Sequence, residues 1–372
     1  MRIGIDAKWY TEGPPSGRRV VRALVDTLVR NYPEHDFYLF FNRRHRASPF
    51  PYPAPNVHPV YVWAGNNMLS NVLVLPFYEQ RLKLDAVLYQ NFISPFGPSR
   101  KTAYIHDVLF LSHPQYYTLP ERLYFAPLRW LTRKADAVIT VSEEERKRLM
   151  HYSFAKNAGD ITVVHHGVDT SFKPRESFNA EKVRLVKERY QLPDRFLLFV
   201  GRLNLRKNVD NLLRAIPLLN DKGIPLVIVG STNWKGSDHE RTVRSLGLEN
   251  RIQFTGSVVE DLGIIYSLAT VFCFPSFAES FGLPPLEAMA SGVPVVVSNT
   301  TSLPEICGDA GTYADPESPE SIAQAVDTLL GNAQLYAEKR AKALSQASRF
   351  TWDKAASLTL QVMIDTTKRT PA

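Results

Sequence analysis

Two glutamates, Glu279 and Glu287, lie eight positions apart in the sequence E-S-F-G-L-P-P-L-E. The segment follows an apolar run and opens a predicted helix. Gly282 lets the backbone approach a ligand closely, and Pro284 and Pro285 suit a first helical turn, where a missing N–H is tolerated. One glutamate precedes the turn and the other lies about one turn into the helix, so they are predicted to hold different parts of one ligand.

The backbone between these glutamates is predicted to bind an anion. The N–H groups of Phe281, Gly282 and Leu283 lie at the start of the helix, where the helix dipole also attracts negative charge. Carboxylates beside a bound anion favour a ligand that carries hydroxyl groups as well. A sugar or a ribose attached to phosphate meets both requirements.

A second charged segment, G-R-L-N-L-R-K at 201–207, follows another apolar run. The guanidinium of Arg202 and the ammonium of Lys207 suit a diphosphate. A diphosphate that leaves during glycosyl transfer gains negative charge, and fixed cations stabilise that charge most in the transition state. Together the two segments predict transfer of a sugar from a nucleoside diphosphate.

The elements that must position these segments have the pattern of a doubly wound α/β domain. Apolar runs that end at glycine, proline or serine alternate with amphipathic stretches in the second half, at 196–200, 226–229, 252–254, 271–274 and 293–297. This alternation predicts βαβ units and a parallel sheet. Ligands of such sheets bind outside the carboxyl ends of the strands, where both charged segments lie.

The first half repeats this pattern. The predicted strands are 2–6, 37–41, 57–62, 86–89, 102–105, 137–141 and 162–164, and the predicted helices are 18–31, 69–82, 121–134 and 143–152. Ser142 is expected to cap the last helix, with Glu145 completing a capping box. Residues 165–174 form a turn-rich connector, and a final helix is predicted at 351–368.

Two Rossmann-like domains follow from these elements. The predicted acceptor-binding domain comprises 1–168 and the C-terminal helix 353–372, and the predicted donor-binding domain comprises 169–352. Their length agrees, because 372 residues exceed one ordinary core. No apolar run reaches the roughly 20 residues of a membrane span, and the N-terminus does not resemble a signal peptide. A cytoplasmic protein is therefore expected.

The net charge of +7 belongs to the first half, since residues 1–168 hold 21 Lys and Arg against 14 Asp and Glu. No zinc-ligand or RNA-binding motif accompanies the excess, so no nucleic acid is expected. An anionic acceptor, an anionic membrane or an ordinary solvated surface would each agree with it. The candidate contacts are Arg18, Arg19, Arg22, Arg43, Arg44 and Arg46.

Both charged segments resemble those of the retaining glycosyltransferases of family 4, which have the GT-B fold of two facing Rossmann-like domains. The similarity is carried by Gly201-Arg202…Lys207 and by Glu279…Glu287 with its continuation A-M-A-S-G-V-P. It covers nearly the whole chain and is strongest from 196 to 315.

The resemblance implies roles for the charged residues. Arg202 and Lys207 would bind the diphosphate, Glu279 would contact hydroxyls of the donor sugar, and Glu287 would hold the ribose hydroxyls. The family needs no metal and no cofactor beyond the nucleotide-sugar substrate, and the sequence contains no Asp-x-Asp.

Other segments acquire roles from the same resemblance. The amides of Phe281, Gly282 and Leu283 would hold phosphate and sugar oxygens, and the loop from Gly256 to Val258 would flank the base. His106, in the sequence Y-I-H-D-V-L-F, would lie across the cleft near the donor sugar; a purely structural role for it stays open. Residues 13–18 would form a glycine-rich loop beside the diphosphate through Gly17 and Arg18, although two prolines and Arg19 depart from the family pattern Gly-x-Gly-Arg-Tyr.

The implied reaction moves a hexose, with retention of configuration, from a UDP- or GDP-linked donor to a saccharide or lipid-linked saccharide. Such a reaction belongs to polysaccharide or glycoconjugate biosynthesis, and the enzyme would be cytoplasmic or peripheral at the inner membrane surface. Three alternatives remain: a GT-B phosphorylase, a nucleotide-sugar epimerase, and a non-catalytic nucleotide-sugar-binding protein. A P-loop kinase and a GxGxxG hydride-transfer enzyme are excluded because neither motif is present.

Overall fold

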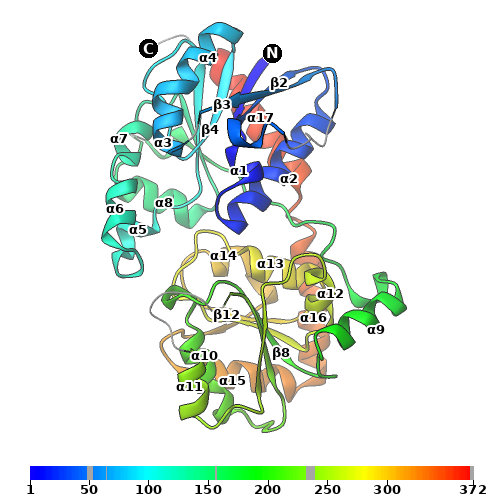
Figure 1. Ribbon diagram of the computed structural model, residues 1–372. Helices are drawn as coiled ribbons and strands as arrows, with labels where there is room; N and C mark the ends of the chain where they lie inside the picture. The colour runs from blue at the N-terminus through cyan, green and yellow to red at the C-terminus, as the bar shows by residue number, and fades with distance from the viewer. Residues whose placement is uncertain (48–52, 64, 156, 232–238, 369–372) are drawn as a thin grey trace. The chain divides into compact units, whose positions relative to one another are not determined.

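The computed structural model describes residues 1–47, 53–63, 65–155, 157–231 and 239–368. The chain divides into two compact units, which Figure 1 shows: unit 1 is Met1–Gly167 with Thr351–Ala372, and unit 2 is Val168–Phe350. The sequence predicted boundaries at 168/169 and 352/353. The last four residues of the predicted C-terminal helix lie outside the described residues.

Unit 1 contains a seven-stranded sheet in the order β3-β2-β1-β4-β5-β6-β7, with every neighbouring pair parallel. The strands are β1 Arg2–Asp6, β2 Asp36–Asn42, β3 Val57–Val62, β4 Ala86–Gln90, β5 Arg100–Ile105, β6 Ala137–Thr140 and β7 Ile161–Val163. All seven lie where the apolar runs predicted strands. The strand order reverses between β1 and β4, so their carboxyl ends form the topological switch point of this sheet.

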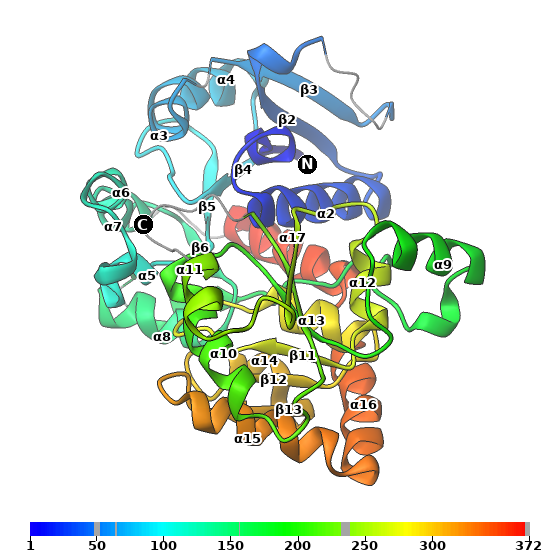
Figure 2. The same cartoon turned by 60° about the horizontal axis from the view of Figure 1, so that its bottom comes forward.

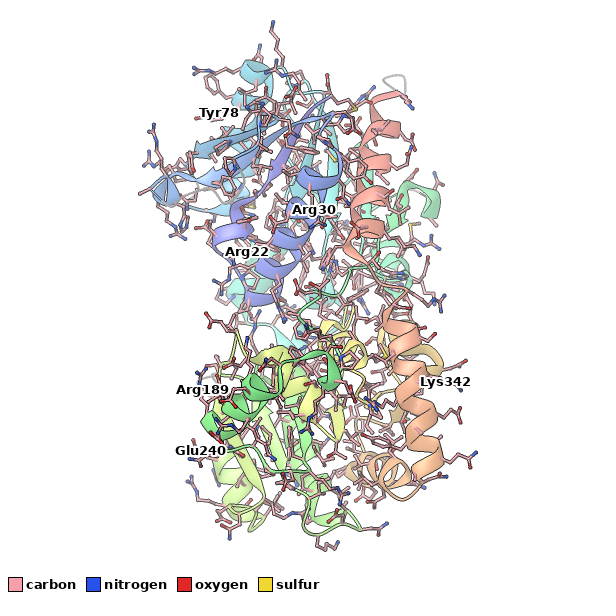
Figure 3. All side chains as sticks on the ribbon, turned by 90° about the vertical axis from the view of Figure 1, so that its right-hand side faces the viewer. Arg22, Arg30, Tyr78, Arg189, Glu240 and Lys342 are labelled. Atoms are coloured by element: carbon pink, nitrogen blue, oxygen red, sulfur yellow. The ribbon has the colours of Figure 1, made fainter. Side chains whose placement is uncertain are left out.

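The helices of unit 1 pack against this sheet. They are α1 Lys8–Thr11, α2 Pro15–Asn31, α3 Asn67–Leu69, α4 Leu75–Leu82, α5 Leu109–Ser112, α6 Leu119–Phe125, α7 Leu128–Thr132, α8 Glu143–His151 and α17 Trp352–Lys368. The C-terminal α17 packs on α2 and β5. Arg30 of α2, labelled in Figure 3, forms an exposed 3.7 Å ion pair with Asp353 of α17.

Two of the predicted helices in unit 1 are interrupted. The helix predicted at 69–82 contains a wide π-helical turn, Ser70–Val74, between α3 and α4. The helix predicted at 121–134 is two helices, α6 and α7, and α7 starts after Pro127. A proline cannot donate the backbone hydrogen bond that a continuous helix requires, and this accounts for the second break.

Two other local predictions were wrong. Helix α2 begins at Pro15, so Gly17 and Arg18 belong to its first turn and not to a loop. Ser142 does cap α8 by accepting the N–H of Glu145 at 3.0 Å. The Glu145 carboxylate does not return that bond, because it accepts the N–H of Val108 at 2.6 Å and pairs with Arg148.

Unit 2 contains a six-stranded parallel sheet in the order β10-β9-β8-β11-β12-β13. The strands are β8 Leu197–Val200, β9 Leu226–Val229, β10 Ile252–Gly256, β11 Val271–Phe274, β12 Val295–Ser298 and β13 Gly311–Ala314. The short edge strand β13 was not predicted, because G-T-Y-A is not an apolar run. The order reverses between β8 and β11, which carry the two charged segments at their carboxyl ends.

Helices cover both faces of the unit 2 sheet (Figure 2). They are α9 Ala180–Arg189, α10 Val209–Ala215, α11 His239–Ser245, α12 Leu262–Leu268, α13 Leu283–Ala290, α14 Leu303–Cys307, α15 Pro319–Leu330 and α16 Ala333–Ala347. Two doubly wound parallel sheets confirm the predicted fold class. No helix of the described ranges is both long and apolar enough to cross a bilayer.

Candidate active site in unit 2

The loop after β8 folds back as soon as the strand ends. Adding a Cβ at Gly230 would place it 2.0 Å from the Gly201 carbonyl oxygen, so the ends of β8 and β9 approach too closely for a side chain there. Asn204 then accepts the N–H of Lys207 at 3.2 Å and caps a short 3-10 turn, Leu205–Lys207. This turn presents Arg206 and Lys207 at the switch point.

The loop after β11 is joined to the loop after β8 by side-chain and backbone hydrogen bonds. Phe277 donates its N–H to the Arg206 carbonyl at 2.9 Å, and the Arg206 guanidinium donates to the Ala278 carbonyl. Asn208 donates its side-chain amide to the carbonyl of Pro275 at 2.8 Å. The two loops therefore form one framework across the switch point.

The Glu279 carboxylate lies at the centre of this framework. One oxygen accepts from Lys207 Nζ at 2.6 Å and from the Ser276 hydroxyl at 2.6 Å. The other oxygen lies 3.1 Å from the Arg206 guanidinium. Lys207 Nζ also lies 4.6 Å from the centroid of the Phe274 ring, so the lysine is held by both charge and an aromatic face.

Electrostatics keep this cluster ionised at neutral pH. Burial alone would raise the pKa of the Glu279 carboxyl, but Arg206 and Lys207 outweigh burial and hold that pKa well below its usual range. Burial, together with the neighbouring charges of Arg206 and Arg202, lowers the pKa of Lys207 to about 8, against the opposing effect of Glu279. The site therefore combines one carboxylate with three neighbouring cations.

The loop after β12 holds the backbone of the Glu279 segment. Thr301 accepts the N–H of Glu279 at 3.0 Å. Ser302 donates its hydroxyl to the carbonyls of Glu279 and Phe281 at 3.1 and 2.7 Å. These bonds fix the backbone of Glu279 and Phe281 against the loop after β12.

Helix α13 begins without a side-chain cap. Gly282 occupies the N-cap position with φ of 118°, a conformation that favours glycine. Pro284 and Pro285 have no N–H, so the donors at this end are the amides before them. Within the described residues, the N–H groups of Gly282 and Leu283 donate to no protein acceptor. An uncapped helix start with available amides is suited to an anion.

Glu287 lies further along α13 and is 3% exposed. One of its carboxylate oxygens accepts the hydroxyl of Tyr266, from α12, at 3.0 Å. Tyr266 in turn packs edge-on against Phe172. This contact holds the glutamate in one orientation from the side of α12.

The other predicted donor contacts lie at neighbouring strand ends. Arg202 is exposed, and it is near enough to lower the pKa of Lys207. Gly256 ends β10 with φ of 72°, and Val258 follows in a half-buried position. Unit 2 thus brings together the charged and amide groups that the sequence predicted, at the carboxyl ends of β8, β10 and β11.

Comparisons with known sequences match both halves of the chain. The profile described as "Glycosyl transferases group 1" matches residues 184–349, and "Glycosyltransferase Family 4" matches residues 17–172. The chain is 32% identical over 276 residues to the O-antigen chain mannosyltransferase B of Escherichia coli, which covers 73% of this chain and 71% of the relative. The chain belongs to glycosyltransferase family 4.

Other similar proteins differ in length or share only the fold. The chain is 32% identical over 235 residues to the serotype-specific mannosyltransferase WbdA of Escherichia coli, and the match covers 61% of this chain but 28% of the relative. Sucrose-phosphate synthase from Thermosynechococcus elongatus superimposes with a TM-score of 0.78 at 19% identity, over 98% of both chains. The fold of this family 4 enzyme is GT-B.

Arg206 is the main residue of the glycosyltransferase site that sequence reasoning missed. Its position before Lys207 gave no sign that it would reach Glu279. Thr301 and Ser302 were also missed, because they lie beyond β12 and act on the backbone of the Glu279 segment. Ser276, which donates to Glu279, was not predicted to have a role. The hydroxyl-rich sequence S-N-T-T-S at 298–302 was the available signal.

Gly17 and Arg18 lie in unit 1, on α2. Gly17 is buried, and an added Cβ would lie 2.8 Å from the ring of Trp9. The Arg18 N–H donates to the Pro14 carbonyl at 2.9 Å, as part of the helix start. Gly17 therefore has a packing role against Trp9, and a phosphate contact by either residue stays a prediction.

His106 follows β5 in unit 1 and is half-buried in a cluster of rings. Its Nε2 lies 2.7 Å from the Gln90 side-chain oxygen, and its ring stacks on Tyr104 at 4.9 Å between centroids. Trp9 and His166 also contact it. Burial lowers the pKa of His106 to about 4, so the ring is neutral at pH 7. A contact with the donor sugar stays a prediction.

Neither cysteine forms a disulfide, and Cys273 and Cys307 are both buried. Over the described ranges, no group of three or more His, Cys, Asp and Glu side chains could hold a metal ion.

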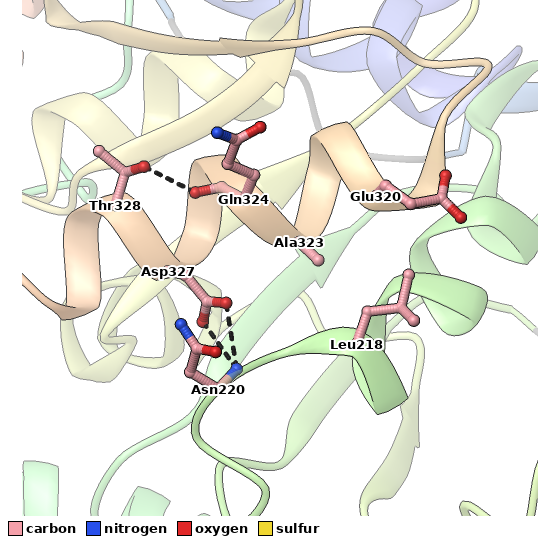
Figure 4. A pocket seen from close by; sticks show the side chains of 7 residues that line it. All are labelled: Leu218, Asn220, Glu320, Ala323, Gln324, Asp327 and Thr328. Atoms are coloured by element: carbon pink, nitrogen blue, oxygen red, sulfur yellow. Dashed lines mark hydrogen bonds between the residues drawn. The ribbon is translucent and has the colours of Figure 1, made fainter.

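A hollow of about 530 Å³ lies elsewhere on unit 2, between α15 and the 3-10 turn Ile216–Leu218 (Figure 4). Its lining residues are Leu218, Asn220, Glu320, Ala323, Gln324, Asp327 and Thr328. The Asp327 carboxylate accepts the N–H of Asn220 at 3.1 Å. None of these seven residues is basic, so the hollow does not offer the charge that a diphosphate requires.

Proposed function

We propose that this glycosyltransferase moves a mannosyl unit, with retention of configuration and without a metal ion, from a nucleoside diphosphate to a saccharide. The cluster of Lys207, Arg206 and Glu279 beside the uncapped start of α13 is the observation that carries the proposal. The choice of mannose follows the 32% identity with the O-antigen chain mannosyltransferase B. The base of the donor is either uracil or guanine.

The diphosphate is placed between Lys207, Arg202 and the amides of Gly282 and Leu283. Cations and amides that converge on the leaving group stabilise charge that develops as the glycosidic bond breaks. This arrangement supplies positive charge from the chain itself, which is the basis for proposing that a metal is not required.

The hydroxyl groups of the donor are placed on the two glutamates. Glu279 precedes the amides and contacts the hexose, while Glu287, further along α13, holds the ribose. The loop at Gly256 and Val258 flanks the base. A carboxylate accepts hydrogen bonds from hydroxyl groups with roughly twice the strength of a neutral acceptor, so each glutamate discriminates in favour of hydroxylated partners.

Retention requires that the acceptor attack from the face that the diphosphate leaves. The acceptor oxygen forms a bond to the anomeric carbon while the bond from that carbon to the phosphate oxygen breaks. The departing phosphate oxygen receives the electron pair and then the proton of the acceptor hydroxyl. The protein contributes position and electrostatic stabilisation, and Glu279 stabilises the positive charge that develops on the sugar ring.

The acceptor is proposed to be a saccharide or a lipid-linked saccharide in glycoconjugate biosynthesis. The saccharide acceptor is suggested by one relative, which is named as an O-antigen chain mannosyltransferase. A phosphorylase would consume inorganic phosphate, and an epimerase would convert the donor without an acceptor. Both alternatives are therefore separable by their products.

The test is incubation of the protein with GDP-mannose, UDP-glucose and related donors, with and without mannose-containing acceptors. Nucleoside diphosphate should be released only when an acceptor is present. Nuclear magnetic resonance of the product should show that the new glycosidic bond keeps the α configuration of the sugar in an α-linked donor. Activity should persist in EDTA. Inverted product, or activity that disappears in EDTA and returns with a divalent cation, would contradict the corresponding part of the proposal.

A further inference from the structure

Large apolar side chains are exposed along one side of the segment that contains α3, the π-helical turn and α4. Leu69 is 40% exposed, Leu73 63% and Phe77 60%. The positions two residues away from each of them, Asn71, Leu75 and Glu79, are buried. The exposed residues Leu69, Leu73 and Phe77 are spaced four apart and lie on one outer, apolar side of the segment. The buried residues lie on the opposite side, which faces the core.

The helices α6 and α7 extend this apolar surface. Leu119 and Leu123 are each 64% exposed and Trp130 is 58% exposed. Tyr124 of α6 and Met68 of α3 pack on the same core cluster. Figures 1 and 2 both show α3 beside α6 and α7. Leu69 and Leu123 adjoin these two packed residues, so the exposed side chains form one neighbourhood.

The same neighbourhood is basic. Arg122, Arg129, Arg133 and Lys134 are exposed on α6, α7 and the residues after α7. The one acidic residue of α6, Glu121, uses its carboxylate to complete the capping box with Thr118. Positive side chains thus surround the exposed leucines and Trp130, which is the composition of a surface that binds at a lipid interface.

We propose that this apolar–basic face, consisting of Leu69, Leu73, Phe77, Leu123, Trp130 and Arg129, places unit 1 on an anionic lipid bilayer. Arginines attract the anionic headgroups, and leucine, phenylalanine and tryptophan enter the interface between headgroups and acyl chains. The positive charge around the apolar side chains favours a bilayer over a neutral protein partner. This proposal does not depend on the identity of the sugar donor.

The face differs from the arginines that the sequence first suggested for such a contact. Arg22, labelled in Figure 3, donates to the Tyr10 carbonyl at 2.5 Å and lies over the Tyr10 ring. Arg44 pairs with Glu12. These cations are engaged within unit 1, whereas the exposed apolar residues lie on α3 to α7.

The test uses the whole chain and sedimentation with vesicles of phosphatidylcholine, alone or mixed with phosphatidylglycerol. Binding to the mixed vesicles and release by added salt are expected. The double variant Leu73→Ser/Phe77→Ser and the variant Arg129→Glu should each lower the bound fraction at least tenfold. Leu185→Ser and Arg244→Glu, at exposed positions of unit 2, are matched controls that should bind like the parent protein.

Tryptophan emission gives a second readout. Binding should shift the emission to shorter wavelength, and Trp130→Phe should reduce that shift. The proposal is overturned if the parent protein does not bind the mixed vesicles, or if the face variants bind as well as the controls do. Thermal melting of each variant separates loss of binding from loss of folding, and the exposed positions are expected to leave the melting temperature unchanged.

A different observation concerns Glu279, whose carboxylate already pairs with Lys207 and Arg206. We infer that Glu279 acts as an internal counter-ion, and that a bound diphosphate replaces it at these two cations. Lys207 Nζ has a 2.6 Å bond to Glu279 and an aromatic face at 4.6 Å, so a phosphate oxygen must compete with the carboxylate. The released carboxylate then becomes available to the sugar. This inference rests on the proposed function.

Titration calorimetry with GDP and UDP alone tests the exchange. Glu279→Gln removes the competing charge, so the nucleoside diphosphate is expected to bind about five- to tenfold more tightly while sugar transfer is lost. Glu287→Gln is the matched control, because it removes a carboxylate that does not pair with Lys207, and its affinity should fall. Weaker binding by Glu279→Gln overturns the counter-ion role. No binding of either nucleotide to any form overturns the proposed function itself.

Discussion

The two sheets have the same order around their switch points, yet the polar groups at those points are arranged differently. In unit 1, Lys8 Nζ lies 2.6 Å from Asp6 and donates to Asn71 at 2.6 Å. Asn71 donates to Asp6 at 2.8 Å and to the Phe92 carbonyl at 2.7 Å. Asp6 and Lys8 are each 1% exposed. These three side chains form a closed, buried ring.

In unit 2 the corresponding ion pair is less enclosed, because the side chains of Lys207 and Glu279 are 11% and 8% exposed. Lys207 and Glu279 come from different loops, an exposed Arg202 lies nearby, and α13 starts without a side-chain cap. The comparison shows that a doubly wound sheet provides a crevice at its switch point. The fold alone does not determine whether that crevice binds a ligand. Side chains that satisfy one another close the crevice in unit 1, and unpaired amides keep it receptive in unit 2.

The largest expected effect comes from breaking the ring in unit 1. Lys8→Met leaves Asp6 charged and buried without its cation, and loss of one partner of a buried pair lowers the free energy of unfolding by about 3–5 kcal/mol. Urea unfolding measures this loss. Nucleotide affinity of the molecules that remain folded should not change, and a loss of affinity with unchanged stability would contradict the structural role of the ring.

The matching change in unit 2 should lower activity much more than stability. Lys207→Ala is expected to lower sugar transfer about 10²–10³-fold, because a fixed cation at the leaving group is removed. Stability should change less than in Lys8→Met, since Arg206 still pairs with Glu279. Initial rates and urea unfolding of both variants test the contrast, which fails if Lys207→Ala retains normal transfer.

A smaller effect is expected at Glu287. The Glu287→Gln variant should bind the nucleoside diphosphate about 10- to 100-fold more weakly, because a hydrogen bond to a charged group contributes about 1.5–3 kcal/mol. Tyr266→Phe removes only the hydroxyl that orients Glu287, so its effect should be severalfold at most. Calorimetry distinguishes them, and equal effects of both changes would argue that Glu287 has a packing role alone.

How far the sequence predicts this molecule depends on the range of the interactions involved. The central strands of both sheets follow from apolar runs, because a strand that is buried on both faces is apolar along its whole length. The short edge strand β13 and the break at the π-helical turn depend on tertiary packing. They have no local signal of comparable strength.

The candidate site divides in the same way. Lys207, Glu279 and Glu287 could be found because their residue types and spacing follow strand ends. Arg206 and Thr301 could not be assigned, since their roles arise only when three loops meet. Glu145 illustrates the limit: its spacing from Ser142 predicts a capping box, but the buried N–H of Val108 is a competing donor that lies far away in the sequence.

The smallest prediction concerns acid stability at His106 in unit 1. Burial lowers its pKa to about 4 from the ordinary 6.5. As the pH falls through this interval, the unfolded chain binds a proton that the folded chain does not, so stability decreases. Melting temperatures measured between pH 7 and pH 4 should decline less steeply for His106→Asn. Identical slopes for both proteins would rule out this contribution.

The wide turn at Ser70–Val74 has a consequence for how this chain can change. A π-helical turn is equivalent to one extra residue in an α-helix, and each residue of an α-helix advances the direction of the side chains by about 100°. Deleting one residue there would make the helix regular and would rotate Leu73 and Phe77 relative to Asn71. A single deletion would thus alter the buried ring and the outer apolar surface together.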